Sequence, residues 1–301
     1  MTHAILEALA ASGHGAHTAD VEALIQPGIW LRATCQANRP PPDPDHPEPL
    51  VDTGDPRTTP RFASLDLALA ALPLGASRFG GVPDLPPGVA WPARDDVPME
   101  FVAQLRLADC AAHDPLGRLP ATGHLWFFYN SQWLTFDRDG DPACCAVLYH
   151  DVADDQLVRH APPRVDYQGE YDDGPRLAPY VHGLATLELA TYPRLPASQC
   201  APWITPALDP FWYVFTDAYR GLTEPPFTGH YQGNWLLGYI DAPDWVGAHA
   251  HGTDDQLLLQ VDSDGAAHFQ WGDCDRLYFV IDKASLAARD FSQARLYSLL
   301  G

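Results

Sequence analysis

The sequence predicts a mainly β protein with a few short helices and a helical extension at its N-terminus. Short apolar segments rich in aromatic and β-branched residues recur along the chain, which is the pattern of strands. Turn-forming residues separate them, since the 301 residues include 23 Gly and 30 Pro. In the clearest example, residues 255–279, we interpret the order as a strand, an Asp-rich turn, a short Trp-bearing strand, a Gly-Asp turn and another strand.

The chain divides by composition into three segments. Residues 1–35 are predicted to be a helical extension, with one helix over residues 2–11 and a second over residues 19–25. A strand could begin at Ile29, after the second helix. Residues 36–61 are rich in Pro and Asp, so we expect a linker or ordered loop, because proline removes a backbone donor and bars the preceding residue from a helix. Residues 62–301 are predicted to form a single β domain.

Within this domain the strands are predicted from apolar runs between turn signals. They are expected at residues 99–107, 123–130, 146–150, 184–189 and 291–300, and residues 211–215 are also β-prone. A short helix is predicted over residues 283–289. Two of the strands resemble each other: Phe101–Leu107 and Leu257–Asp262 each place a Gln inside an apolar run. Each is followed by a Gly and then by Leu-Trp-Phe-Phe or Leu-Tyr-Phe-Val, so two related β units from an internal duplication would explain the pattern.

Composition narrows the classes of partner and compartment. The formal net charge is −21, from 18 basic and 39 acidic residues. Such a chain repels nucleic-acid phosphates and favours basic partners, so we expect a protein partner and no nucleic acid. The six Cys form no C-x-x-C pair, and neither a signal peptide nor a membrane-length apolar run is apparent. We therefore expect a cytoplasmic protein with no membrane association and with free, mostly buried thiols.

A set of motifs in a fixed order resembles a known family. The motifs are Ser77–Pro86, Trp91-Pro92, Phe101–Leu105, Gly123–Tyr129, Leu236–Tyr239, Leu257–Asp264 and Trp271–Ile281. Together they resemble the YwqG-like family, also called the DUF1963 domain of unknown function, over roughly residues 61–300. Two departures are notable: Asp275 stands where the family often has Gly, and Asn234 and Ile240 stand where it often has His and Pro.

The resemblance implies a mainly β, roll-like fold in cytoplasmic bacterial proteins. Some members of the family are encoded near polymorphic toxin genes, which implies toxin neutralisation or another binding role. The family carries no settled activity, and a fold alone does not assign one.

Asp262, Asp264 and Asp273, with Arg276 beside them, are the candidate catalytic residues. If the two turns that carry them meet, the carboxylates could bind a divalent cation or share a proton, and Arg276 could pair with one of them or with a ligand carboxylate. The alternative is structural. In it, the Asp side chains bond to the local backbone and Gly265 supplies a positive φ. No cofactor is otherwise predicted.

Two further candidate sites come from loops. Gly80 and Gly81, with Arg78 beside them, are suited to close backbone approach to a ligand or to another strand. His249 and His251 share one side of an extended segment and could ligate zinc, but no third ligand is evident from their spacing.

Three functions remain open on this evidence. The first is a non-catalytic binding protein, of which an immunity-type protein that neutralises a toxin would be one kind. The second is a metal-dependent or acid/base hydrolase that uses Asp262, Asp264 and Asp273, and the third is a small-ligand sensor. No G-x-S-x-G elbow, G-x-G-x-x-G loop or P-loop occurs, so the sequence favours a protein that is not an enzyme.

Overall fold

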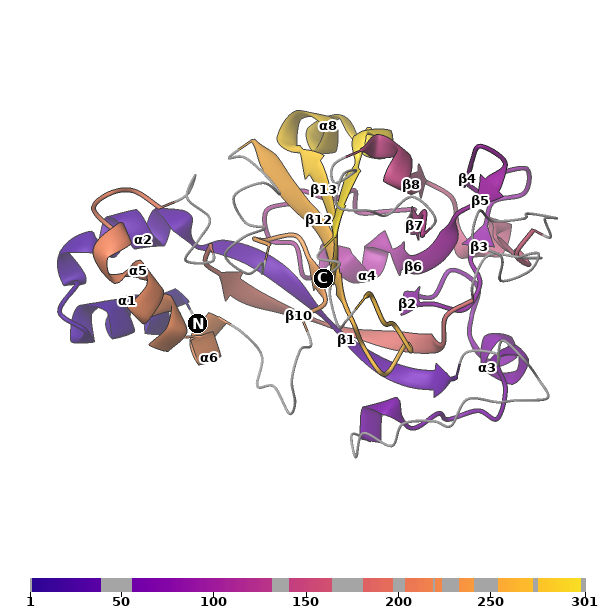
Figure 1. Cartoon of the computed structure of the whole chain (residues 1–301), viewed down its shortest axis with the longest axis horizontal. Coiled ribbons are helices and arrows are strands. Elements are labelled where there is room, and N and C mark those ends of the chain that lie inside the picture. Colours follow the sequence, from indigo (N-terminus) through magenta and orange to yellow (C-terminus); the bar gives the residue numbers. More distant parts are fainter. Residues whose placement is uncertain are drawn as a thin grey trace.

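The computed structural model describes residues 2–38, 56–131, 141–163, 181–196, 204–218, 220–223, 233–240, 254–272 and 276–298. This part of the chain is mainly β, as predicted. Its centre is one ten-stranded sheet that curves into a barrel-like roll, and short helices lie around it (Figure 1).

Neighbouring strands of the sheet are antiparallel, in the order β14-β13-β12-β11-β1-β10-β2-β6-β7-β8. Their bounds are β1 Gln26–Ala37, β2 Arg78–Phe79, β6 Glu100–Arg106, β7 His124–Tyr129, β8 Cys145–His150, β10 Leu184–Arg194, β11 Trp235–Leu236, β12 Asp255–Asp262, β13 Arg276–Asp282 and β14 Arg295–Ser298. Two small ribbons pair β3 (Asp84–Leu85) with β9 (Val158–Arg159) and β4 (Ala93–Arg94) with β5 (Val97–Pro98).

The long pair β1 and β10 forms the middle of the sheet. Along β1, Ile29, Leu31, Ala33 and Cys35 are fully buried, while the residues between them are partly exposed. This alternation with period two gives the strand one face toward the core. The predicted segment boundary at residue 35 therefore falls inside a central strand, and the helical part of the extension ends before Gln26.

On either side of β1 and β10 lie two units of four strands that correspond element by element. One is β2-β6-β7-β8 and the other is β11-β12-β13-β14, and each begins with a strand of two residues. The first unit joins β10 at Thr186, and the second joins β1 at Trp30. Midway between these two points, Arg32 and Glu188 face each other across the central pair at 2.9 Å.

The two Gln-bearing strands predicted as repeats occupy equivalent positions in these units. Gln104 of β6 lies between Arg78 and Trp126, and Gln260 of β12 lies between Trp235 and Tyr278.

Both strands have an irregularity at the same place, with a register shift between Phe101 and Ala103 in β6 and between Leu257 and Leu259 in β12. A β-bulge at matched positions is a specific feature of a backbone. The structure therefore contains the two related β units that the sequence predicts.

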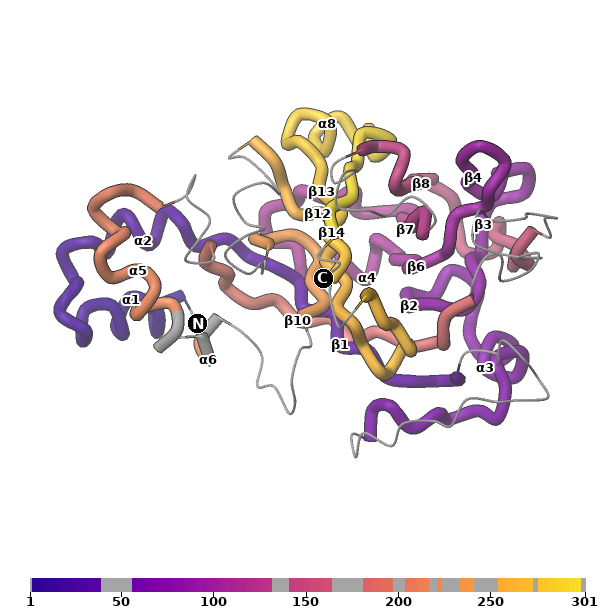
Figure 2. The backbone as a smooth tube through the Cα atoms, viewed as in Figure 1, coloured from indigo at the N-terminus to yellow at the C-terminus, as the bar shows by residue number. Residues whose placement is uncertain are grey.

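The helices of the described residues are short. They are α1 Thr2–Ala11, α2 Thr18–Leu24, α3 Leu65–Ala71, α4 Leu107–Ala111, α5 Asp209–Ala218, α6 Arg220–Thr223 and α8 Lys283–Ala288. Figure 2 shows α1, α2 and α5 gathered at one end of the molecule, beside the start of β1. In the described part of the chain, none of these helices has the length and apolar character needed to cross a bilayer.

Three local predictions differ from the structure. Residues 211–215 are not a strand but part of α5, because Phe211, Trp212 and Phe215 fall on one helical face and pack against Ile5 and Leu9. That packing overrides the β propensity of an aromatic run. Trp271 lies in irregular structure rather than in a strand. The predicted strand over residues 291–300 begins instead as the 3₁₀ turn Phe291–Gln293, and in the described residues its strand part is Arg295–Ser298.

Candidate functional site

Arg78, predicted as a candidate ligand-binding residue beside Gly80 and Gly81, lies in β2 with its side chain fully buried. Its Nη1 donates to Asp84 Oδ2 at 2.9 Å and to the carbonyl of Ala76 at 3.2 Å, and its Nη2 donates to the carbonyl of Val82. The Arg78 side chain therefore holds the segment before β2, at Ala76, and the segment after it, at Val82 and Asp84, in place.

Asp84 is the centre of this buried cluster. Besides Arg78, its carboxylate accepts from Arg159 Nε at 2.8 Å and from the Gly75 backbone N–H at 3.0 Å. Burial by itself would raise the pKa of Asp84. The charge of Arg78 and the hydrogen bonds from Arg159, Arg78 and Gly75 outweigh burial and hold that pKa below its usual range. Asp84 is therefore an ionised carboxylate shared by two arginines.

Gln104 connects this cluster to the sheet. Its Oε1 accepts from the backbone N–H of Asp84 at 2.8 Å and from Trp126 Nε1 at 2.9 Å, and its Nε2 donates to the Ala76 carbonyl at 3.2 Å. The amide side chain in β6 thus satisfies polar groups that the loop and β7 would otherwise bury without partners. In the second unit, the equivalent Gln260 donates from Nε2 to the carbonyl of Gly233.

Gly80 and Gly81 do approach another backbone closely. Both have left-handed backbone conformations, with φ of 61° and 67°. A Cβ on Gly80 would lie 1.8 Å from the carbonyl oxygen of Gly183, just before β10, and one on Gly81 would lie 3.0 Å from Leu184. The sequence left open whether a ligand or another strand approaches these glycines. In the structure, the backbone at the start of β10 does so.

The second unit repeats this turn with a different side chain. Leu237 and Gly238 follow β11 with φ of 62° and 85°, as Gly80 and Gly81 follow β2. The N–H of Gly80 donates to Val102 O at 2.8 Å, and that of Leu237 donates to Leu258 O at 3.3 Å. A turn of two left-handed residues thus ends the first strand of each unit, and the Gly-Gly loop is its form in the first unit.

Asp262 and Asp264 do come together, through Asn234. Asn234 Nδ2 donates to Asp264 Oδ2 at 2.7 Å, and Asn234 Oδ1 accepts from the Asp262 backbone N–H at 2.8 Å. Asp262 Oδ2 also accepts from Gly233 N at 2.8 Å, and Arg276 Nε lies 3.3 Å from Asp262 Oδ1. Both carboxylates are almost completely buried, at 0% and 1% exposed.

Asp264 also forms the predicted Asx-type turn, since its Oδ1 accepts from Ala266 N at 2.8 Å. The positive φ in this turn belongs to His268 (54°) rather than to Gly265, so that detail of the prediction was wrong. Burial, with a smaller contribution from the nearby Asp262 charge, raises the pKa of Asp264 against its hydrogen bonds.

The other predicted ligands of this region are not part of this geometry. Asp273, His249 and His251 lie outside the described residues. Among the residues that are described, no three His, Cys, Asp or Glu side chains gather as a metal site would require.

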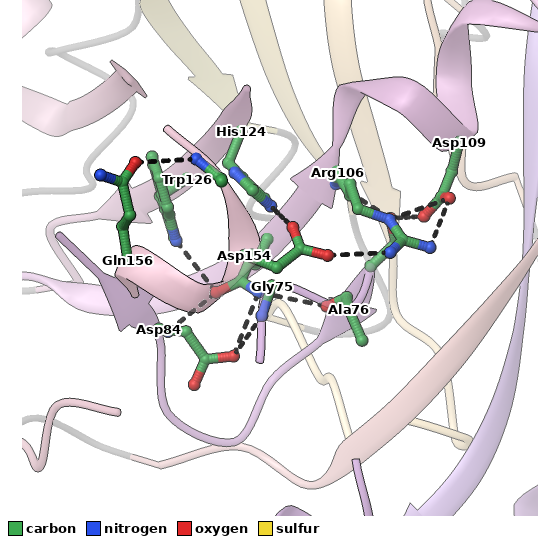
Figure 3. A network of polar contacts seen from close by, with 12 residues as sticks. Gly75, Ala76, Asp84, Arg106, Asp109, His124, Trp126, Asp154 and Gln156 are labelled. Carbon is green, nitrogen blue, oxygen red and sulfur yellow. Dashed lines mark hydrogen bonds and ion pairs between the residues drawn. The ribbon is translucent and has the colours of Figure 1, made fainter. Parts of the chain in front are cut away.

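A partly exposed network joins the loop before β2 to α4 and to the 3₁₀ turn Asp154–Gln156 (Figure 3). Arg106 donates through Nε and Nη2 to Asp109 Oδ1 at 3.0 and 2.8 Å, and through Nη1 to Asp154 Oδ2 at 3.0 Å. His124 Nε2 lies 3.0 Å from Asp154 Oδ1. Burial lowers the pKa of His124 more than Asp154 raises it.

The contact between His124 and Asp154 has the composition of a catalytic acid–base pair, but its imidazole is not accessible to a substrate. The His124 side chain is buried, and its Nδ1 has no hydrogen-bond partner among the described residues, so none of these residues places a nucleophile on the ring. The carboxylates of Asp109 and Asp154 each accept hydrogen bonds from Arg106. The arrangement fixes the turns around β6 and β7.

The family model for DUF1963, described as a domain of unknown function, matches residues 77–298. The chain belongs to the DUF1963 family. The match covers both four-stranded units and β10, while α1, α2 and β1 precede it. No curated protein matches the chain in sequence. The resemblance proposed from the motifs is therefore confirmed.

A polar cluster of this DUF1963 chain has no motif that could have revealed it. Glu100, at the start of β6, accepts from Tyr129 Oη at 2.8 Å and from Ser131 Oγ at 2.6 Å, and His182 Nε2 lies 3.4 Å away. Burial alone would raise the pKa of Glu100, but its bonds and charge contact with His182, with help from both hydroxyls, lower it. Three separate segments meet here, so only the tertiary fold brings these residues together.

We expect the Asp262→Asn variant of the DUF1963 chain to lose about 1–3 kcal/mol of unfolding free energy, because the partly buried Arg276 loses the negative charge of Asp262 and the Gly233 N–H contact is disturbed. Urea denaturation followed by tryptophan fluorescence would measure the loss. Asp254→Asn, an exposed residue just before the same strand, is the matched control and should change stability by less than about 0.5 kcal/mol. If the unfolding free energy of Asp262→Asn equals that of the wild type, the Asp262 carboxylate is not needed for stability, and a chemical role would be favoured.

Proposed function

We propose that this DUF1963 chain is a non-catalytic binding protein that recognises a basic protein partner in the cytoplasm, as an immunity-type neutraliser of a toxin would. The observation that carries the proposal is the distribution of charge. The chain has 39 acidic and 18 basic residues, and at least eight of the 18 are held in ion pairs with its own carboxylates. Those eight are Arg32, Arg78, Arg94, Arg106, Arg118, Arg159, Arg276 and Arg295.

Internal pairing leaves few cations to offset the acidic excess at the surface. A protein with such a field attracts a positively charged partner over long distances and accelerates the encounter. Neutralisation of a toxin is a function for which rapid and tight encounter matters, so this charge pattern supports the binding proposal.

The reactive side chains of the described residues also fit binding better than catalysis. Arg78, Asp84, Asp262 and Asp264 are buried and bonded to one another or to the backbone. Burial, with smaller contributions from nearby acids, raises the pKa of Cys110 to about 12, which keeps this thiol protonated and unreactive at neutral pH. The hydrolase and ligand-sensor alternatives rest on these same groups, and neither gains support from their geometry.

We expect the chain to co-purify with the product of the gene next to its own, and to protect cells that express that product. Because the attraction is electrostatic, the affinity should fall by about tenfold or more between about 0.1 M and 1 M salt, as the Debye length shrinks from about 10 Å to about 3 Å. Calorimetry at the two salt concentrations would measure this.

An unrelated basic protein of similar size and charge is the specificity control, and it should bind more weakly than the neighbouring gene product. If the neighbouring product neither binds nor is neutralised, the immunity proposal fails. If it binds with an affinity that salt does not change, the acidic surface is not what recognises it.

A further inference from the structure

A small helical lobe formed by α1, α2 and α5 stands at one end of the molecule (Figures 1 and 2). Its own core includes Ile5, Leu9 and Val21 from the N-terminal helices and Trp212 and Phe215 from α5. These side chains are between 0% and 3% exposed, so the lobe is packed and presents a defined surface.

The solvent-facing side of α5 is apolar at its middle. Tyr213 and Val214 are 62% and 69% exposed, more than any other large hydrophobic side chain in the described residues. They follow the exposed Asp209 and Pro210 at helical spacings of three and four residues, which places the four on one stripe. The opposite side of α5 is the one that packs into the lobe.

The lobe is also strongly acidic. The sequences of α1, α2, α5 and the 3₁₀ turn Gly15–His17 contain no Lys or Arg, and the short α6 nearby contributes Arg220. Exposed carboxylates come from Glu7, Asp20, Glu22 and Asp209. An exposed apolar stripe on an acidic support is the arrangement that binds an amphipathic segment of opposite charge.

We infer that the solvent face of α5, supported by α1 and α2, is the docking surface for a basic amphipathic segment of a protein partner. This assignment rests on the proposed function and names the surface and the chemistry of the partner. Apolar side chains of the segment pack on Tyr213 and Val214, and its Lys and Arg side chains meet Asp209 on the same stripe and the other exposed carboxylates of the lobe.

Charge argues against the other classes of occupant. A second copy of the chain would bring the same carboxylates against themselves, which costs free energy. Nucleic acid and anionic membranes carry negative phosphates and are repelled in the same way. A basic protein segment is the occupant that this surface complements.

The lobe also lies partly outside what the family shares. The DUF1963 match covers residues 77–298 and so includes α5 but neither α1 nor α2. The docking surface therefore combines a family element with an extension that the family model does not describe, and it can set which partner this chain selects.

The test uses the full chain and a fluorescein-labelled synthetic peptide of Leu and Lys, about 18 residues long, which is five turns of amphipathic helix. Anisotropy titrations are run at about pH 8, where an ordinary imidazole carries no charge. We expect the Tyr213→Ser, Val214→Ser double variant to bind at least about tenfold more weakly than the wild type. Leu67→Ser, on the exposed face of α3, is the matched control and should bind like the wild type.

The charge of the lobe is tested with a triple variant, Glu7→Gln, Asp20→Asn and Glu22→Gln. It should weaken binding and flatten the salt dependence, whereas the control triple Asp66→Asn, Asp96→Asn and Asp155→Asn, at exposed sites on other elements, should not. Equal loss from both triples would show general attraction to an acidic protein and overturn the assignment.

The remaining outcomes distinguish an error in the assigned docking surface from an error in the proposed function. If the double variant binds the peptide as tightly as the wild type, the α5 face takes no part and the inference is wrong. If sedimentation shows a wild-type dimer that the double variant loses, a second copy occupies the face, which also overturns the inference. If the neighbouring gene product binds wild type and double variant equally, the proposed function stands and only this surface is misassigned.

Discussion

The Asp84→Asn variant is expected to lose about 3–5 kcal/mol of unfolding free energy, one of the two largest effects we predict. Arg78 is fully buried, and its carboxylate partner is Asp84 at 2.9 Å. An amide at position 84 can still accept a hydrogen bond, but it removes the negative charge. The buried guanidinium is then left with neutral acceptors, among them the Ala76 and Val82 carbonyls, where it had a carboxylate. Removing one member of a buried ion pair costs more than the pair contributes, because the other charge stays desolvated.

The matched variants should differ in a defined order. Arg78→Met leaves Asp84 paired with the partly exposed Arg159 at 2.8 Å, so it should cost less than Asp84→Asn. The double variant Arg78→Met, Asp84→Leu removes both charges and should also cost less than Asp84→Asn alone. Urea denaturation of the four proteins gives this order, and a loss below about 1 kcal/mol for Asp84→Asn would contradict it.

The ionisation of Asp84 also determines the direction in which stability changes with pH. The folded-state pKa of Asp84 is depressed below its unfolded value of about 3.9. Its contribution is therefore fully present above about pH 4 and is lost as the pH falls through the folded-state pKa, since the unfolded chain then binds the proton first. Asp84→Asn should accordingly flatten the acid limb of the stability curve while leaving its neutral plateau lower.

The elements that local patterns determine were predictable from the sequence. Alternating apolar runs predicted β6, β7, β8, β12 and β13, and the shared Gln predicted the correspondence between the two units. The helix of residues 211–215 was not predictable, because its aromatic run acquires a helical face only when Ile5 and Leu9 pack against it. The hydrophobic partner lies about two hundred residues away in the chain, beyond the reach of any local window.

The candidate site was likewise predictable only in part from the sequence. Asp262 and Asp264 were recognisable as candidates from the Asp-rich turn. The residue that links them is Asn234, which the sequence marked only as a departure from the family pattern. Arg78 and Gly80 were recognisable as special from the loop composition. Their partners Asp84, Gln104 and Gly183 depend on how β2 pairs with β6 and β10, and such pairing is set by tertiary structure.

The Gly80→Ala variant should be the more damaging of two glycine substitutions that share the same backbone strain. A Cβ at position 80 would lie 1.8 Å from the Gly183 carbonyl oxygen, so the loop and the start of β10 would have to separate. That movement would break the hydrogen bonds from Gly80 N to Val102 O and from Gly81 N to His182 O. We expect a loss above about 4 kcal/mol or failure to fold, since backbone cannot yield as a side chain can.

Gly88→Ala isolates the contribution of the backbone conformation. Gly88 has φ of 83°, also left-handed, but a Cβ there would meet no atom within 4 Å. Its cost should be only that of an L-residue in this region, about 1–2 kcal/mol. The difference between the two variants in urea denaturation therefore measures the contact between the Gly80 turn and β10. Equal losses would mean that the positive φ, and not this close approach, is what the glycine is needed for.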